Sequence, residues 1–75
     1  MKDIKVYSSS TCPYCTMMKD YLKSKNVEFV EKNVSTDEDA RKELMAMGHM
    51  GVPVTLIDGT EIVGYDTTKV DALLD

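Results

Sequence analysis

The stretch that decides the fold is residues 4–25, which read IKVYSSSTCPYCTMMKDYLKSK. It opens on the short apolar run 4–7, which three serines terminate, a pattern typical of a β-strand. Pro13 then predicts the start of a helix, because the missing N–H of proline would have no partner at the first helical position. Four apolar side chains follow at helical spacing and predict a helix to about residue 25: Tyr14, Met18, Tyr21 and Leu22.

The middle of the chain predicts a second strand and a second helix. Residues 27–30 (VEFV) are apolar-rich and indicate the strand. Ser35, followed three residues later by Glu38, matches a capping box and predicts the start of the helix. Gly48 is expected to end it. Three side chains are expected on its inward face: Ala40, Leu44 and Met47.

The last part of the chain predicts a hairpin and a third helix. The apolar runs 54–57 and 61–63 flank an Asp-Gly pair at 58–59. Such a pair between two strands is a strong signal for a two-residue turn. Asp66 or Thr67 is expected to cap the final helix, because both residue types favour that position.

The predicted order of elements is therefore β-α-β-α-β-β-α, which belongs to the α/β class. A strand–helix–strand unit makes its two strands parallel, whereas a hairpin makes them antiparallel. We expect a mixed four-stranded sheet with helices packed on its faces. At 75 residues the chain is short enough to form one domain, 1–75.

Composition and charge exclude several classes of function. The net charge of −4 argues against general nucleic-acid binding, which usually needs a basic surplus. No apolar run of membrane-spanning length is present, and no signal-peptide pattern follows Met1. We therefore expect a soluble cytoplasmic monomer that binds neither nucleic acid nor membrane.

The pair Cys12 and Cys15, spaced as Cys-Pro-Tyr-Cys, is the one group with obvious chemistry. Buried cysteines can be small hydrophobic residues, but a position at a helix start after a strand is too specific for that. Structural zinc usually needs four ligands, and His49 would supply only a third, so no metal is expected. A redox-active dithiol is favoured, because this spacing on a strand–helix unit is typical of thiol–disulfide exchange.

Cys12 is expected to be the nucleophile. The first amides of a helix have no partner within the helix, so those of Tyr14 and Cys15 can donate to a thiolate at Cys12. The helix dipole adds a smaller favourable effect. Cys15 lies one turn further on and faces the sheet, so we expect it to be the resolving thiol, which attacks a mixed disulfide on Cys12.

Taken together, these motifs resemble the glutaredoxin family in its small bacterial form, and the resemblance covers nearly the whole chain. Its markers are the Cys-Pro-Tyr-Cys motif, the segments 51–53 (GVP) and 62–66 (IVGYD). The resemblance implies a thioredoxin-like fold, a cis peptide bond before Pro53, and thiol–disulfide oxidoreductase activity on protein or glutathione mixed disulfides. It implies no bound cofactor, with glutathione as reductant or co-substrate.

The resemblance also implies a substrate site around the dithiol. Tyr14 would flank the reacting sulfur, and the backbone of Val52 would pair with the substrate. The segment after Gly64 would hold a substrate carboxylate on the free amides of a helix start. The residues so implied are Pro13, Tyr14, Val52, Pro53, Gly64, Asp66 and Thr67.

Two departures from the family pattern leave the reductant open. Ser9 stands where family members often carry a lysine that pairs with glutathione, and Val63-Gly64 replaces a glycine pair. Lys19 or Arg41 are candidates for the missing charge. The valine and the single glycine also resemble those of glutaredoxin-like redoxins, which thioredoxin reductase reduces and which donate electrons to ribonucleotide reductase.

Two alternatives from other classes of function remain. One is an iron–sulfur carrier in which two chains each lend Cys12 to a cluster, although Pro13 and the available Cys15 make it less favoured. The other is a non-catalytic binding module on the same fold, because fold alone does not determine function.

Overall fold

The computed structural model describes residues 3–49 and 51–74, and its elements follow the predicted order. In chain order the elements are β1 (Ile4–Ser8), α1 (Pro13–Ser24), β2 (Val30–Asn33), α2 (Glu38–Ala46), β3 (Val54–Ile57), β4 (Thr60–Val63) and α3 (Thr67–Leu74).

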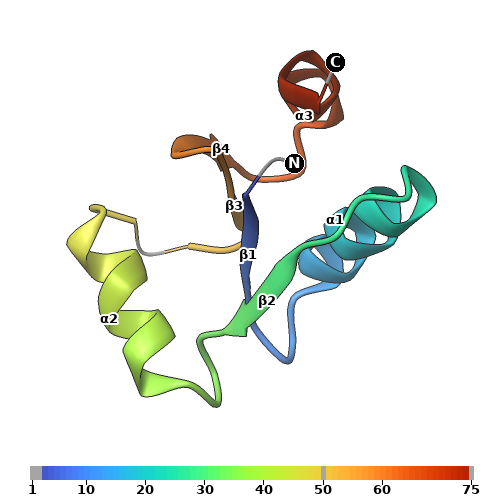
Figure 1. The fold of residues 1–75 in the computed structure, drawn as a ribbon. Coiled ribbons are helices and arrows are strands. Elements are labelled where there is room, and N and C mark those ends of the chain that lie inside the picture. Colours follow the sequence, from blue (N-terminus) through green and yellow to red (C-terminus); the bar gives the residue numbers. More distant parts are fainter. Residues whose placement is uncertain (1–2, 50, 75) are drawn as a thin grey trace.

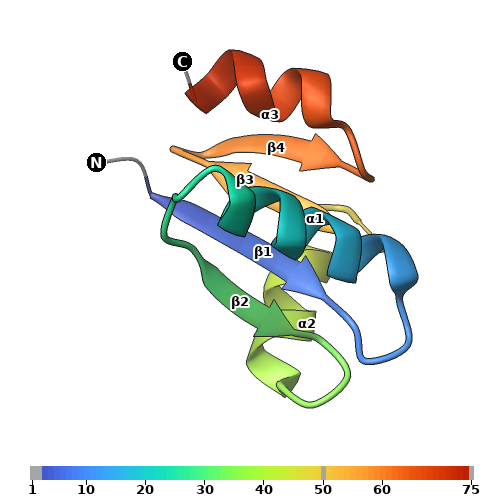
Figure 2. The ribbon, with the colours of Figure 1, turned by 90° about the vertical axis from the view of Figure 1, so that its right-hand side faces the viewer.

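The four strands form one sheet in the order β2-β1-β3-β4. β1 pairs in parallel with β2 and antiparallel with β3, and β3 pairs antiparallel with β4. The predicted mixed sheet is thus confirmed. β1 is central, and the chain leaves its carboxyl end directly into the loop that carries Cys12 (Figure 2).

Helices cover both faces of the sheet, with α1 and α3 on one side and α2 alone on the other (Figure 1). The α1 and α3 side holds the larger buried cluster, made of Ile4, Val6, Met18, Leu22, Ile57, Ile62 and Val70. The α2 side holds Tyr7, Ala40, Leu44 and Val54. Because side chains alternate along a strand, β1 supplies both clusters and joins them through the sheet.

The hairpin and the first helix were predicted correctly. Asp58 and Gly59 connect β3 to β4 with φ angles of 50° and 87°, and this left-handed pair gives the twist that a tight hairpin needs. In α1, Met18 and Leu22 are buried. Tyr14 is 59% exposed, so its expected place on the inward face was wrong. Cys15 occupies that face instead.

The second strand lies three residues later than predicted. β2 begins at Val30, and its partners on β1 run from Lys5 opposite Val30 to Ser8 opposite Asn33. Val27 and Phe29 pack against the larger cluster from the preceding loop. An edge strand needs little apolar character, so the polar residues of β2 hid it from the pattern.

The second helix also begins later than predicted. Asp37, rather than Ser35, is its N-cap, and the Asp37 carboxylate accepts from the amides of Asp39 and Ala40 at 3.0 and 3.2 Å. The hydroxyl of Ser35 accepts from the amide of Ser10 instead, at 3.3 Å. Gly48 follows the helix with φ of +86°, which confirms the predicted end.

Within the described ranges, no helix is long and apolar enough to cross a membrane.

Candidate active site

Cys12 is the N-cap of α1. Its backbone is extended, with φ of −100° and ψ of 107°, and Pro13 begins the helix behind it. Of the two amides expected to donate to the Cys12 sulfur, that of Cys15 does so at 3.2 Å. The sulfur is half-buried, so it can meet both a helix amide and a substrate. A thiolate at this position is stabilised by the amide and by the positive end of the helix.

Cys15 lies directly behind Cys12 and is completely buried. Burial, together with a hydrogen bond to the Cys12 sulfur, raises the pKa of Cys15 to about 12. The backbone of Ser9 and the charge of Lys19 act in the opposite direction. The two thiols are therefore unequal, because the outer one is solvated and amide-bonded while the inner one is held as a neutral thiol at neutral pH.

Val52 faces Cys12 from the loop before β3. The Cys12 sulfur lies 3.8 Å from the Val52 carbonyl oxygen, which accepts from the thiol. The Val52–Pro53 peptide bond is cis, as the family resemblance implied, and Pro53 is buried. The amide of Gly64 donates to the Pro53 carbonyl at 2.8 Å. One hydrogen bond thus joins the Val52 loop to the turn after β4.

Pro13 and Tyr14 lie on the outer side of the sulfur pair. Pro13 is exposed, and the Tyr14 ring is 59% exposed at the first turn of α1. A large, exposed aromatic ring next to a reactive sulfur can cover a bound substrate without being part of the core.

Asp66 and Thr67 form the start of α3. Asp66 accepts from the amide of Lys69 at 3.1 Å, as an N-cap residue does. The starts of α1 and α3 lie at the same end of the molecule (Figure 2). The amino ends of both helices thus lie at this end of the molecule, where an anionic group would be favoured.

Three polar contacts made by side chains were not predicted from the sequence. The ammonium group of Lys19 pairs with the Glu31 carboxylate at 2.7 Å, and the Ser8 hydroxyl donates to the same carboxylate at 3.0 Å. The charge of Lys19 is therefore already paired, which weakens it as a candidate for the missing lysine. His49, expected to be solvated, contacts the Glu61 carboxylate.

Within residues 3–49 and 51–74, no group of three or more His, Cys, Asp and Glu residues is arranged to hold a metal ion.

Comparison with known proteins agrees with this geometry. The family model described as Glutaredoxin matches residues 4–62. An uncharacterised glutaredoxin-like 8.6 kDa protein in the rubredoxin operon of Clostridium pasteurianum is 47% identical over 73 residues, which cover 96% of this chain and 97% of that protein. Glutaredoxin 3 of Escherichia coli K12 is 36% identical over 67 residues, covering 88% of this chain and 81% of its own.

A solved structure shows the same fold. The crystal structure of the thioredoxin-like protein BC3987 superposes with a TM-score of 0.89 at 33% identity, covering 95% of this chain and 99% of its own. The fold is thus thioredoxin-like. With the family model matching well over half of its residues, the chain belongs to the glutaredoxin family, whose members are thiol–disulfide oxidoreductases.

Proposed function

We propose that this glutaredoxin reduces protein or glutathione mixed disulfides through a dithiol formed by Cys12 and Cys15, and that glutathione reduces it in turn. One observation supports this most directly. The Cys12 sulfur accepts a hydrogen bond from the Cys15 amide at the N-terminus of α1, while the Cys15 sulfur is buried behind it. One sulfur is placed to meet a substrate and the other to meet only its neighbour.

The first step is attack by the Cys12 thiolate on a substrate disulfide. A new bond joins the Cys12 sulfur to one substrate sulfur, and the old disulfide bond breaks. The other substrate sulfur leaves with the electron pair and takes a proton from solvent. The amide of Cys15 supports the thiolate before attack, because a charged acceptor strengthens the hydrogen bond it receives.

The second step is attack by Cys15 on the Cys12 sulfur. Cys15 gives up its proton, a disulfide forms between the two cysteines, and the bound substrate leaves as a thiol. Two molecules of glutathione then reverse this change. The first opens the internal disulfide to a mixed disulfide on Cys12, and the second releases oxidised glutathione.

The residues around the sulfur pair suit an extended thiol peptide. The Val52 backbone faces Cys12, so it can pair with the peptide backbone that carries the reacting sulfur. Tyr14 would cover one side, with Pro13 beside it, and Pro53 and Gly64 hold the Val52 loop in place. A carboxylate at the far end of the peptide would meet the free amides at the start of α3, at Asp66 and Thr67.

A second reductant is favoured by one observation. Ser9 carries no charge, and Lys19 is already paired with Glu31 at 2.7 Å, so neither is a free cation for the glycyl carboxylate of glutathione. This arrangement favours reduction of the chain by a flavoprotein of the thioredoxin-reductase type. The chain would then donate electrons to acceptors that include ribonucleotide reductase. In either case the chain would act as a monomer in the cytoplasm, where thiols are kept reduced.

The experiment is to oxidise the protein and offer it each reductant separately. Samples are quenched and alkylated, and the intact mass of the protein counts its free cysteine thiols, with glutathione as reductant in one sample and NADPH with thioredoxin reductase in the other. Rapid reduction by glutathione supports the proposal, and reduction by the flavoprotein alone supports the second candidate. Failure of both, with a visible chromophore after anaerobic reconstitution with iron and sulfide, would point to the iron–sulfur carrier instead.

A further inference from the structure

We propose that Lys19, anchored by Glu31 and Ser8, is a positioning residue that favours the thiolate of Cys15 during the second step. This inference rests on the proposed dithiol mechanism and adds to it a source of positive charge. It concerns the step for which the structure otherwise offers little help, because Cys15 is fully buried.

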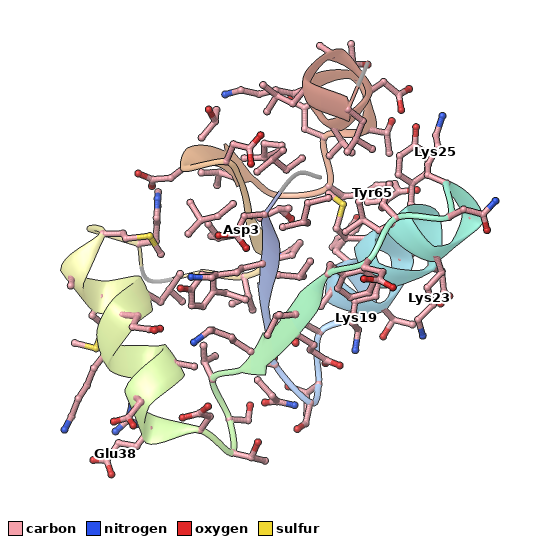
Figure 3. All side chains as sticks on the ribbon, viewed as in Figure 1. Asp3, Lys19, Lys23, Lys25, Glu38 and Tyr65 are labelled. Atoms are coloured by element: carbon pink, nitrogen blue, oxygen red, sulfur yellow. The ribbon has the colours of Figure 1, made fainter. Side chains whose placement is uncertain are left out.

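Lys19 follows Cys15 by four residues on α1, so the two side chains share one face of the helix. The Lys19 side chain is only 22% exposed, although lysines are usually well solvated. It reaches from α1 toward β2, where its ammonium group meets the Glu31 carboxylate at 2.7 Å (Figure 3). The ammonium group is therefore held by Glu31, one helical turn along α1 from Cys15, and its charge acts on the inner thiol.

The anchor is itself well held. The Ser8 hydroxyl, on a completely buried residue at the end of β1, donates to the same Glu31 oxygen at 3.0 Å. These hydrogen bonds hold the pKa of Glu31 below its usual range, with Lys19 the main cause, so its carboxylate stays charged at neutral pH. Because Ser8 lies just before the loop that carries Cys12, this chain of contacts links the anchor to the active site.

The charged and titratable groups around Cys15 are few. Cys12 hydrogen-bonds to it and raises its pKa, the Ser9 backbone lowers it, and among the described residues Lys19 is the cation that acts on it. On the β2 side the charge is Glu31, which acts on Lys19, and Lys23 acts in turn on Glu31. Lys19 is thus the charged side chain best placed to offset the burial of the inner thiol.

The step that Lys19 assists is balanced without any further reactant. Cys15 loses its proton to solvent, and its sulfur attacks the Cys12 sulfur of the mixed disulfide. One disulfide bond forms between the cysteines, and the bond to the substrate breaks. The departing sulfur keeps the electron pair. Lys19 takes no part in bond making and acts only on how often Cys15 is ionised.

The test separates the two steps in one experiment. Reduced protein is mixed in a stopped-flow instrument with a symmetrical nitro-aromatic disulfide whose released thiolate is coloured. The first release reports attack by Cys12 and depends on reagent concentration. The second reports attack by Cys15 and does not. We expect Lys19→Met to slow the second release about three- to tenfold near neutral pH and to shift its pH profile upward, with the first release unchanged.

The controls identify charge as the cause. Lys19→Arg keeps the cation, and we expect it to retain at least about half of the second rate. Lys42→Met makes the same change at an exposed position on α2, and both rates should match wild type. An unchanged first release in Lys19→Met shows that its Cys12 site is intact, so a slow second step cannot come from misfolding.

Three results would overturn the inference. The second rate and its pH profile are unaffected in Lys19→Met, or Lys19→Arg is as slow as Lys19→Met, or both releases slow equally. In each of these cases the wild-type protein still shows two releases, and the proposed function stands. If the wild-type protein releases only one thiolate, the dithiol mechanism fails and this inference fails with it.

Discussion

The starts of α1 and α2 perform the same structural task with different atoms. At α2, the Asp37 carboxylate accepts from two backbone amides, at 3.0 and 3.2 Å. At α1, the Cys12 sulfur accepts from one, at 3.2 Å, and also faces the Val52 carbonyl. Asp37 is a strong cap, whereas a thiol is a weak one.

This difference indicates what each helix start is for. Asp37 is exposed, and the hydrogen bonds of its carboxylate are to the first amides of its own helix. Cys12 lies between α1 and the loop before β3, where a better cap would remove the half-buried sulfur that faces Val52. The helix start at Cys12 thus gives up part of its capping energy and keeps the sulfur that the proposed mechanism requires.

The largest expected effect comes from replacing each sulfur in turn. Cys12→Ser should abolish disulfide reduction, because serine restores a good cap but cannot form a disulfide. Cys15→Ser should still complete the first step and accumulate a mixed disulfide. Activity assays measure the first result, and the intact mass of the protein after exposure to oxidised glutathione measures the second.

The unfolding free energy serves as the control for this pair. Cys12→Ser should be at least as stable as the reduced wild type, which shows that chemistry and capping are separate. Loss of activity in Cys15→Ser with full activity in Cys12→Ser would reverse the assigned roles.

The next effect concerns the structural cap. Asp37→Ala should lower the unfolding free energy by about 0.5–2 kcal/mol, because two amides at the start of α2 lose their acceptor. Asp37→Asn keeps an acceptor oxygen and should lose much less. Denaturant unfolding measures both. The folded Asp37→Ala protein should keep the wild-type rate of disulfide exchange, and a large loss of rate would show that α2 does affect the dithiol.

The smallest effect is a loss of stability in alkali. The pKa of Cys15 is raised to about 12 in the folded protein, above its unfolded value of about 8.5. The folded state therefore retains a proton that the unfolded state releases. The contribution of the Cys15 thiol to the unfolding free energy is thus complete below the unfolded pKa and falls as pH rises above it. The expected loss is at most about 0.8 kcal/mol at about pH 9.

Comparison with one variant isolates this effect. Cys15→Ser removes the buried thiol but keeps Tyr7 and Tyr21, whose pKa values are also raised, the first by burial and the second by its bond to Asp71. Unfolding free energies of the reduced wild type and of Cys15→Ser are measured from neutral pH upward. The difference between them should shrink as pH rises, and a constant difference would contradict the burial of Cys15.

Local signals in the sequence were sufficient for much of the fold. The proline after Cys12, the helical spacing of Met18 and Leu22, and the Asp-Gly turn each act within a few residues, so the structure bears them out. The start of α2 was placed wrongly because Ser35 and Asp37 are both good caps. Only the three-dimensional position of Ser10 decides between them, because its backbone amide donates a hydrogen bond to the Ser35 hydroxyl.

Contacts between distant residues could not be predicted in the same way. The pair of Lys19 and Glu31 depends on the register of β2 against β1, and the sequence placed β2 three residues too early. With the observed register, Glu31 lies opposite Val6, next to the end of β1 and within reach of Ser8. The approach of Val52 to Cys12 was expected only through the family resemblance, because no local signal connects residues that far apart in the chain.

The bond between the Gly64 amide and the Pro53 carbonyl sets a fixed spacing at the surface. It ties the loop that faces the reactive sulfur to the turn that leads into α3. A ligand lying across both segments would therefore meet them at a constant separation. Thiol peptides whose terminal carboxylate is one residue nearer to or farther from the sulfur would contact one segment or the other, but not both.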